Sequence, residues 1–126
     1  MNVGRLIVAA AALTIFSSNA SAHHSWARYD ADHVVTIEGD VTKIEWASPH
    51  VFMNFTAPDD DGKTVEWTME MDPPTLLGRY GLRYDTIKVG MHIKITGVRA
   101  RSGAPIMRAV TIELPDGTVH RVSSRV

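Results

Sequence analysis

The chain of 126 residues contains no cysteine. It can therefore form no disulfide framework, carry out no thiolate chemistry and take no lipid on an N-terminal cysteine. A strongly basic patch is also missing, and the formal net charge is only −1, which argues against nucleic acid as a partner. The sequence has no nucleophile elbow, oxyanion glycine pattern or phosphate-binding glycine loop, so it predicts a protein that is not an enzyme.

The small net charge hides an asymmetry between the two halves of the chain. Residues 23–74 hold eleven acidic residues against three basic ones, whereas residues 75–126 hold three acidic against nine basic. If strands from the two halves interleave in one fold, opposite charges should pair across neighbouring strands.

One long apolar run is present, and it lies at the N-terminus. Arg5 precedes the apolar stretch Leu6–Phe16, and Ala20-Ser21-Ala22 has the small-x-small pattern of a cleavage site. These features predict a secretory signal peptide over residues 1–22, cleaved after Ala22. The run is too short for a permanent membrane anchor, so we expect a periplasmic protein with no membrane contact after cleavage.

The mature chain alternates apolar and polar residues in several short runs, which is typical of β-strands. We expect residues 23–33 to form an N-terminal arm and residues 34–126 to form a single β domain. Gly39-Asp40 should bend the first strand, and Pro49 should end it at a tight corner. The expected strands cover residues 34–46, 51–55, 64–71, 91–98, 107–114 and 118–122.

A short helix is predicted between the third and fourth strands. Asp72 suits the N-cap, Pro73 the first helical position, and Gly81 the position just past the end. This order of elements predicts an OB-fold-like, five- to six-stranded antiparallel Greek-key barrel. A plain antiparallel sandwich is the alternative, although it would not need the helix.

The processing site supplies the sharpest chemical hypothesis. Cleavage after Ala22 would leave His23 at the mature N-terminus, where its α-amino group and ring nitrogen can chelate one ion together. A second imidazole, from His24 or His50, would complete a set of three nitrogens. Copper(II) favours such tetragonal nitrogen sites, so we predict copper(II) binding through a histidine brace at His23.

Other interpretations of these histidines stay open. Cleavage after Ala20 would place His23 third behind a free amine, an arrangement that captures copper(II) or nickel(II) through deprotonated backbone amides. A His-His pair at a frayed terminus could equally be solvated and idle, and zinc is disfavoured because no matching ligand spacing accompanies the pair. The competing functional hypothesis is an envelope module that binds a small molecule, glycan or protein partner without metal, using Trp46 and Phe52 on a strand face.

Several conspicuous residues are better interpreted as structural. Most of a set of five methionines fall on inward strand faces, which favours core packing over copper(I) ligation; the set is Met53, Met69, Met71, Met91 and Met107. Glu66 and Glu70 share one face of the third strand and fit a solvated acidic face. His92 and His120 are expected on outward strand faces.

Four segments carry a resemblance to a known family. They are Ala22-His23-His24-Ser25, the strand Gly39–Trp46, the corner Pro49-His50, and Gly97-x-Arg99-Ala100-Arg101. Together these segments resemble a domain-of-unknown-function family of small exported bacterial proteins, over essentially the whole mature chain. Ser48 departs from the asparagine that usually precedes Pro-His in that family. The resemblance implies export and a small β fold, and it implies no established activity.

Overall fold

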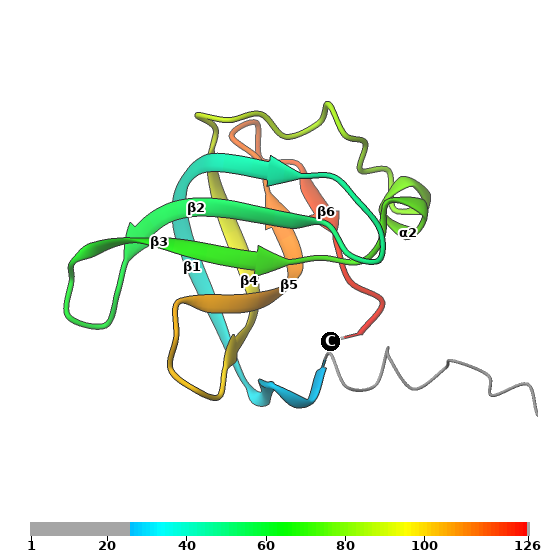
Figure 1. The fold of residues 1–126 in the computed structure, drawn as a ribbon. Coiled ribbons are helices and arrows are strands. Elements are labelled where there is room, and N and C mark those ends of the chain that lie inside the picture. The colour runs from blue at the N-terminus through cyan, green and yellow to red at the C-terminus, as the bar shows by residue number, and fades with distance from the viewer. Residues whose placement is uncertain (1–25, 126) are drawn as a thin grey trace, which may run out of the picture.

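Six strands and one short helix make up the part of the chain that the computed structural model describes, residues 26–125 (Figure 1). The elements are β1 (Tyr29–Glu45), β2 (Phe52–Pro58), β3 (Thr64–Glu70), α2 (Pro74–Arg79), β4 (His92–Ala100), β5 (Ile106–Glu113) and β6 (Val119–Arg121). The all-β class and the helix between the third and fourth strands are confirmed.

The strands are hydrogen-bonded in the order β3-β2-β1-β4-β5-β6, and consecutive neighbours in this order are antiparallel. One further pairing is parallel and joins β3 to β5, with Thr68 opposite Ile106 and Glu70 opposite Arg108. Strands β1 to β5 are therefore linked in a closed circuit of neighbours. Because of this closure, the end of β3 lies beside the start of β5, two segments far apart in sequence.

Strand β1 is one continuous strand that pairs with β4 through its first part and with β2 through its second. It begins at Tyr29, five residues before the expected start, so the last part of the expected arm belongs to the sheet. A Cβ atom added at Gly39 would lie 2.2 Å from the carbonyl oxygen of Thr56. The close approach of β2 thus requires glycine at position 39. The irregularity in the β1–β2 register lies further along β1, between Val41 and Lys43.

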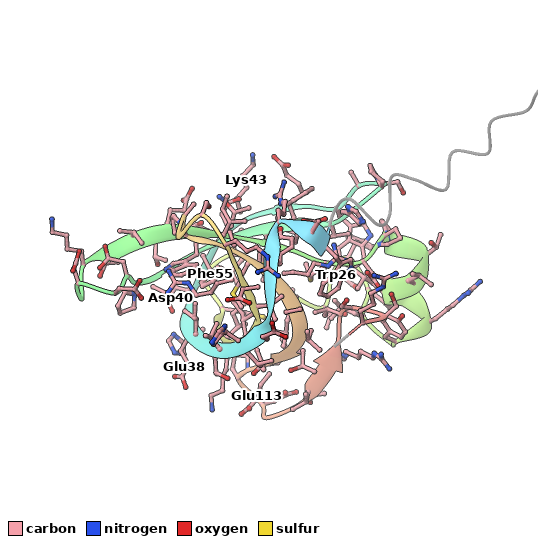
Figure 2. The ribbon with its side chains drawn as sticks, turned by 90° about the horizontal axis from the view of Figure 1, so that it is seen from below. Trp26, Glu38, Asp40, Lys43, Phe55 and Glu113 are labelled. Atoms are coloured by element: carbon pink, nitrogen blue, oxygen red, sulfur yellow. The ribbon has the colours of Figure 1, made fainter. Side chains whose placement is uncertain are left out.

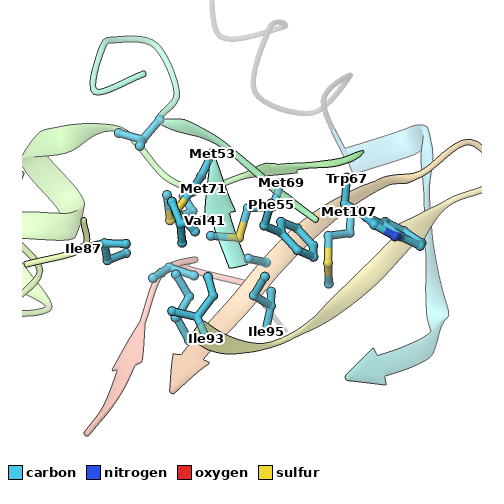
Figure 3. Close-up of a cluster of buried hydrophobic side chains, with 14 of the residues drawn as sticks. Val41, Met53, Phe55, Trp67, Met69, Met71, Ile87, Ile93, Ile95 and Met107 are labelled. Carbon is cyan, nitrogen blue, oxygen red and sulfur yellow. The ribbon is translucent and has the colours of Figure 1, made fainter. Parts of the chain in front are cut away.

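The core lies between the two sides of this strand circuit (Figure 3). Its members come from every strand except β6, with further side chains from the segments around α2. Burying one such side chain contributes about 1.5–3 kcal/mol to stability. The side chains with no more than 1% exposure that Figure 3 labels are Met53, Phe55, Trp67, Met69, Met71, Ile93, Ile95 and Met107. The prediction that the strand methionines pack in the core is confirmed.

Helix α2 differs at its start from the expectation. Pro73 occupies the N-cap position and Pro74 opens the helix, without a side-chain capping bond. Asp72 was expected to cap the helix, but its carboxylate is buried and bonds the guanidinium of Arg108 instead. Gly81 follows the helix with φ +83°, as predicted for the residue past its end. Within residues 26–125, no helix is long and apolar enough to cross a membrane.

Candidate functional site

Three charged side chains are almost completely buried where β3 meets β5. Glu70 and Asp72 are each 3% exposed and Arg108 is 1% exposed. Arg108 Nη1 donates a 2.8 Å hydrogen bond to Glu70 Oε1, and its Nη2 donates to Asp72 Oδ1. The second carboxylate oxygen of Asp72 accepts the backbone N–H of Ser124 at 2.6 Å. Buried charges need such pairing, because removing them from water is costly.

Tyr29, at the start of β1, supplies a further bond to this cluster. Its side chain is fully buried, and its hydroxyl donates to Glu70 Oε2 at 2.6 Å. Burial, reinforced by the neighbouring Glu70 carboxylate, raises the pKa of Tyr29 to about 12. The phenol therefore stays neutral and keeps donating its proton throughout the physiological pH range.

The corner between β1 and β2 brings His50 to the same carboxylate. The Ser48-Pro49 peptide bond is cis, and the corner is fastened by a bond from Met71 N to Val51 O at 2.8 Å. His50 Nδ1 lies 2.8 Å from Glu70 Oε1, the oxygen that Arg108 also contacts. An ionised carboxylate only accepts hydrogen bonds, so Nδ1 is the ring nitrogen that carries the proton whenever the ring is neutral. The lone pair is then on Nε2, and the side chain is 23% exposed.

Trp26, in the segment that leads into β1, packs against the Arg108 guanidinium. The ring centre of Trp26 lies 5.1 Å from Arg108 Cζ and 6.5 Å from the ring centre of Tyr29, in an edge-on arrangement. The backbone is fixed two residues later, because Arg101 N donates to Arg28 O at 2.9 Å. In Figure 2, Trp26 lies beside the start of β1, well away from Glu38 and Asp40 at the bend of the same strand.

The charges of this cluster do not balance among its fully buried members. Glu70 and Asp72 are two carboxylates, and Arg108 is one guanidinium. Arg28 approaches Glu70 Oε2 at 3.9 Å, but its side chain is 56% exposed and therefore largely screened.

The sequence also matches a known family. The pattern of a family of unknown function, DUF6152, matches residues 11–107. The chain belongs to this family. The predicted membership of an uncharacterised domain family is thereby confirmed, and the match includes His50, Glu70 and Asp72. No curated protein matches the sequence.

The structure of this DUF6152 protein covers only some of the predicted site residues. Ala22, His23 and His24 lie outside the described residues. Trp46 and Phe52, the predicted ligand-binding aromatics, are both half-buried; Trp46 packs against the core and Phe52 is paired with Glu70 across β2 and β3. Within residues 26–125, no group of three or more His, Cys, Asp or Glu side chains is placed to hold a metal ion.

The residues that hold His50 were missed by sequence reasoning. Glu70 was expected on a solvated face of β3, but the closure of the strand circuit places β5 over it and buries it. Arg108 did carry a signal, because it is a lone charge in the apolar run Ile106–Val110. A charge in such a run needs a buried partner, yet nothing in the sequence identifies Glu70 as that partner.

Two other polar clusters lie away from this site. His92 on β4 is exposed, as predicted, and its Nδ1 lies 2.7 Å from Asp40, which raises the pKa of His92 above its ordinary value. A second cluster borders an open cavity of about 270 Å³ between the β2–β3 and β4–β5 turns. There Arg99 lies 4.9 Å from the ring centre of Trp67 and donates to Asp60 at 2.7 Å.

Proposed function

We propose that this chain is an exported periplasmic protein that binds copper(II) through His50 and the mature N-terminal His23. In this proposal Nε2 of His50 is one ligand, and the α-amino group and imidazole of His23 are two more. His24 is the alternative source of the second imidazole. The closed strand circuit, with a helix between its third and fourth strands, supports an OB-type barrel as the scaffold.

The single observation that carries the proposal is the contact between His50 Nδ1 and Glu70 Oε1. Metal-binding histidines commonly present their second ring nitrogen to a carboxylate, which fixes the tautomer and the ring orientation. Here the carboxylate is itself held by Tyr29 and Arg108, so its position is set by the core. An idle surface histidine would not need this support. A donor set of two imidazoles and one amine suits copper(II).

Covalent geometry makes the partnership with His23 feasible. Trp26 contacts Arg108, and Arg108 and His50 contact the same oxygen of Glu70. His23 precedes Trp26 by three residues, and three residues span at most about 10 Å. In this proposal a mature N-terminus at His23 would lie within about 10 Å of Trp26, which supports His23 as a partner of His50.

The test is a copper(II) titration of mature protein purified from the periplasm, with its N-terminus verified by mass spectrometry. We expect one tightly bound ion per chain. Adding one residue before His23, or changing His50→Ala, should each weaken binding by tenfold or more, because each removes a ligand. His92→Ala is the matched control, since His92 is exposed and distant from this cluster, and it should leave binding unchanged.

The outcomes separate the parts of the proposal. Absence of tight binding by correctly processed protein would refute the copper function. Unchanged binding in His50→Ala would remove His50 from the ligand set. Glu70→Gln should weaken binding by about 10–100-fold through loss of the orienting carboxylate.

A metal-free ligand-binding module is the second candidate, and the cavity beside Trp67 favours it. The cavity lies beside the buried Trp67 and is bordered by the Arg99 guanidinium and the Asp60 carboxylate, which suits a small polar ligand. Arg99→Ala should abolish binding of such a ligand and leave copper(II) binding unchanged. Screening small molecules by nuclear magnetic resonance on the parent protein and on Arg99→Ala checks this candidate.

A further inference from the structure

The outer edge of β3 is left open over the first half of the strand. β5 pairs with β3 only from Thr68 to Glu70, where Thr68 N donates to Pro105 O at 3.0 Å. The chain that precedes Pro105 does not continue alongside β3. It turns back towards β4 through Gly103, whose φ is +80° and whose N–H donates to Ala100 O. In Figure 1 the β2–β3 hairpin extends past the rest of the sheet, on the left.

This open edge presents backbone groups that are ready to pair with another strand. Successive residues of a strand direct their N–H and C=O groups alternately to its two sides. Because Thr68 directs its N–H away from β2, Glu66 and Thr64 do the same. Within the described chain, no β5 residue pairs with either of them. Each offers one donor and one acceptor, which is the template that an extended chain needs for pairing.

The cavity of about 270 Å³ lies along the same edge. Val65, which is half-buried, and the buried Trp67 border it from β3. Side chains of a strand alternate between the two faces of a sheet, so a strand added beside β3 would direct every second side chain to the face where the cavity lies. Pairing of the backbone would then give affinity, and the cavity would select side chains.

The charge of the cavity indicates which side chain it would select. Three aspartates of the β2–β3 turn border it, against the single guanidinium of Arg99. Arg99 Nη1 already donates to Asp60 Oδ1 at 2.7 Å. Asp59 Oδ1 accepts the N–H groups of Asp61 and Lys63, which fixes the turn. Three carboxylates against one guanidinium leave the border acidic, and an acidic border is complementary to a cationic side chain.

We propose that the edge of β3 at Thr64 and Glu66 binds an extended segment of a partner polypeptide, which places a lysine or arginine side chain in the cavity beside Trp67. The inference does not rest on the copper function, and it gives the cavity of the second candidate a polypeptide ligand. The two kinds of ligand are distinguishable. A small polar molecule in the cavity needs Arg99 but not the backbone of Glu66, whereas a paired strand needs that backbone.

The experiment selects random peptides of about nine residues, displayed on phage, for binding to the parent protein and against binding to Glu66→Pro. Proline removes the outward N–H and leaves the pairing with β2, because an edge strand accepts proline where its N–H faces outwards. We expect the selected peptides to share a lysine or arginine within an alternating β-type pattern. A synthetic copy should bind the parent about tenfold more tightly than Glu66→Pro, as expected for one unmade hydrogen bond.

Glu66→Ala is the matched control for the backbone. It removes the carboxylate that bonds Thr42 and Asn54 but keeps the N–H, so it should bind the peptide as the parent does. Equal losses in Glu66→Ala and Glu66→Pro would overturn the pairing, because the side chain would then be responsible. A selection that returns no peptide with a preference for the parent over Glu66→Pro would overturn it too.

A second pair of variants tests the cationic side chain. Asp61→Asn should weaken binding of the peptide by about threefold, since an exposed ion pair contributes little. Asp116→Asn is the control, because Asp116 is also an exposed turn aspartate and accepts a backbone N–H, that of Thr118. Unchanged binding in Asp61→Asn, or an equal loss in Asp116→Asn, would contradict the assigned cation.

A third measurement needs only the parent protein, so it does not depend on how Glu66→Pro folds. Saturating peptide should slow hydrogen exchange of the Thr64 and Glu66 amides by about tenfold, because pairing protects them. The same peptide with alternate amides N-methylated should not protect them. Unchanged exchange of both amides would refute strand addition. Copper(II) affinity should be the same with and without the peptide, so the fate of the copper function leaves this test unaffected.

Discussion

Replacing Arg108 by methionine removes the one guanidinium that lies between two buried carboxylates. Methionine keeps a similar length and an apolar stem, so the substitution tests the charge more than the volume. Glu70 and Asp72, each 3% exposed, would then lose the buried guanidinium that they share. Tyr29 and Ser124 would still donate to them, but these neutral donors do not compensate the charge.

The magnitude follows from the bonds that are lost. Arg108 makes two hydrogen bonds to carboxylates, and a hydrogen bond to a charged group is worth about 1.5–3 kcal/mol. Removing one partner of a buried ion pair costs about 3–5 kcal/mol, and we expect Arg108→Met to fall in that range. With an m-value of about 2 kcal/mol per M, the urea midpoint should fall by about 2 M.

The assay is equilibrium urea unfolding followed by circular dichroism, with Arg99→Met as the matched control. Arg99 also lies over a tryptophan ring and contacts an aspartate, but its partner Asp60 is 78% exposed. Its loss should therefore cost no more than a surface ion pair does. Equal midpoint shifts for the two variants would refute the argument that burial makes the Arg108 cluster costly to break. Adding Glu70→Gln and Asp72→Asn to Arg108→Met should recover part of the loss, because no uncompensated charge then remains buried.

Two further predictions concern other parts of the sheet. Gly97→Ala should lower the free energy of unfolding by about 1–3 kcal/mol, at the upper end of that range, because the new Cβ would lie 2.1 Å from the backbone oxygen of Arg108. Gly78→Ala, in open space on α2, should instead raise the free energy of unfolding by about 0.5–1 kcal/mol. Urea unfolding that ranks the two variants in the opposite order would contradict this reasoning. The hydrogen bond to Asp40 raises the pKa of His92, so its stabilising effect is full below about pH 6.5 and is lost as the pH rises through the folded-state pKa. His92→Gln should therefore be less stable than the parent protein at pH 5.5 but not at pH 9. In Asp40→Asn, nuclear magnetic resonance titration should show a lower His92 pKa than in the parent. An unchanged His92 pKa in that variant would exclude Asp40 as the cause.

The local rules of the sequence determined the class of the fold. Alternation in residues 64–71 predicted a strand with Trp67, Met69 and Met71 inward, and all three are buried because the period of a strand is two. The helix and Gly81 after it were also predicted from signals that act over a few residues, although the N-cap is Pro73 and not Asp72. Family membership was also readable from the sequence, because short motifs carried it.

The candidate site was decided by tertiary structure. Nothing local distinguishes Glu70 from Glu66, four residues earlier on the same face of β3. Only the parallel pairing of β3 with β5 buries Glu70 and brings Arg108 to it, across 38 residues of sequence. The same pairing brings Arg108 to Asp72, so the Asp72 carboxylate bonds the guanidinium and does not cap the helix. A histidine at a Pro-His corner could be predicted as a candidate, whereas the buried carboxylate that holds its ring depends on contacts between distant strands.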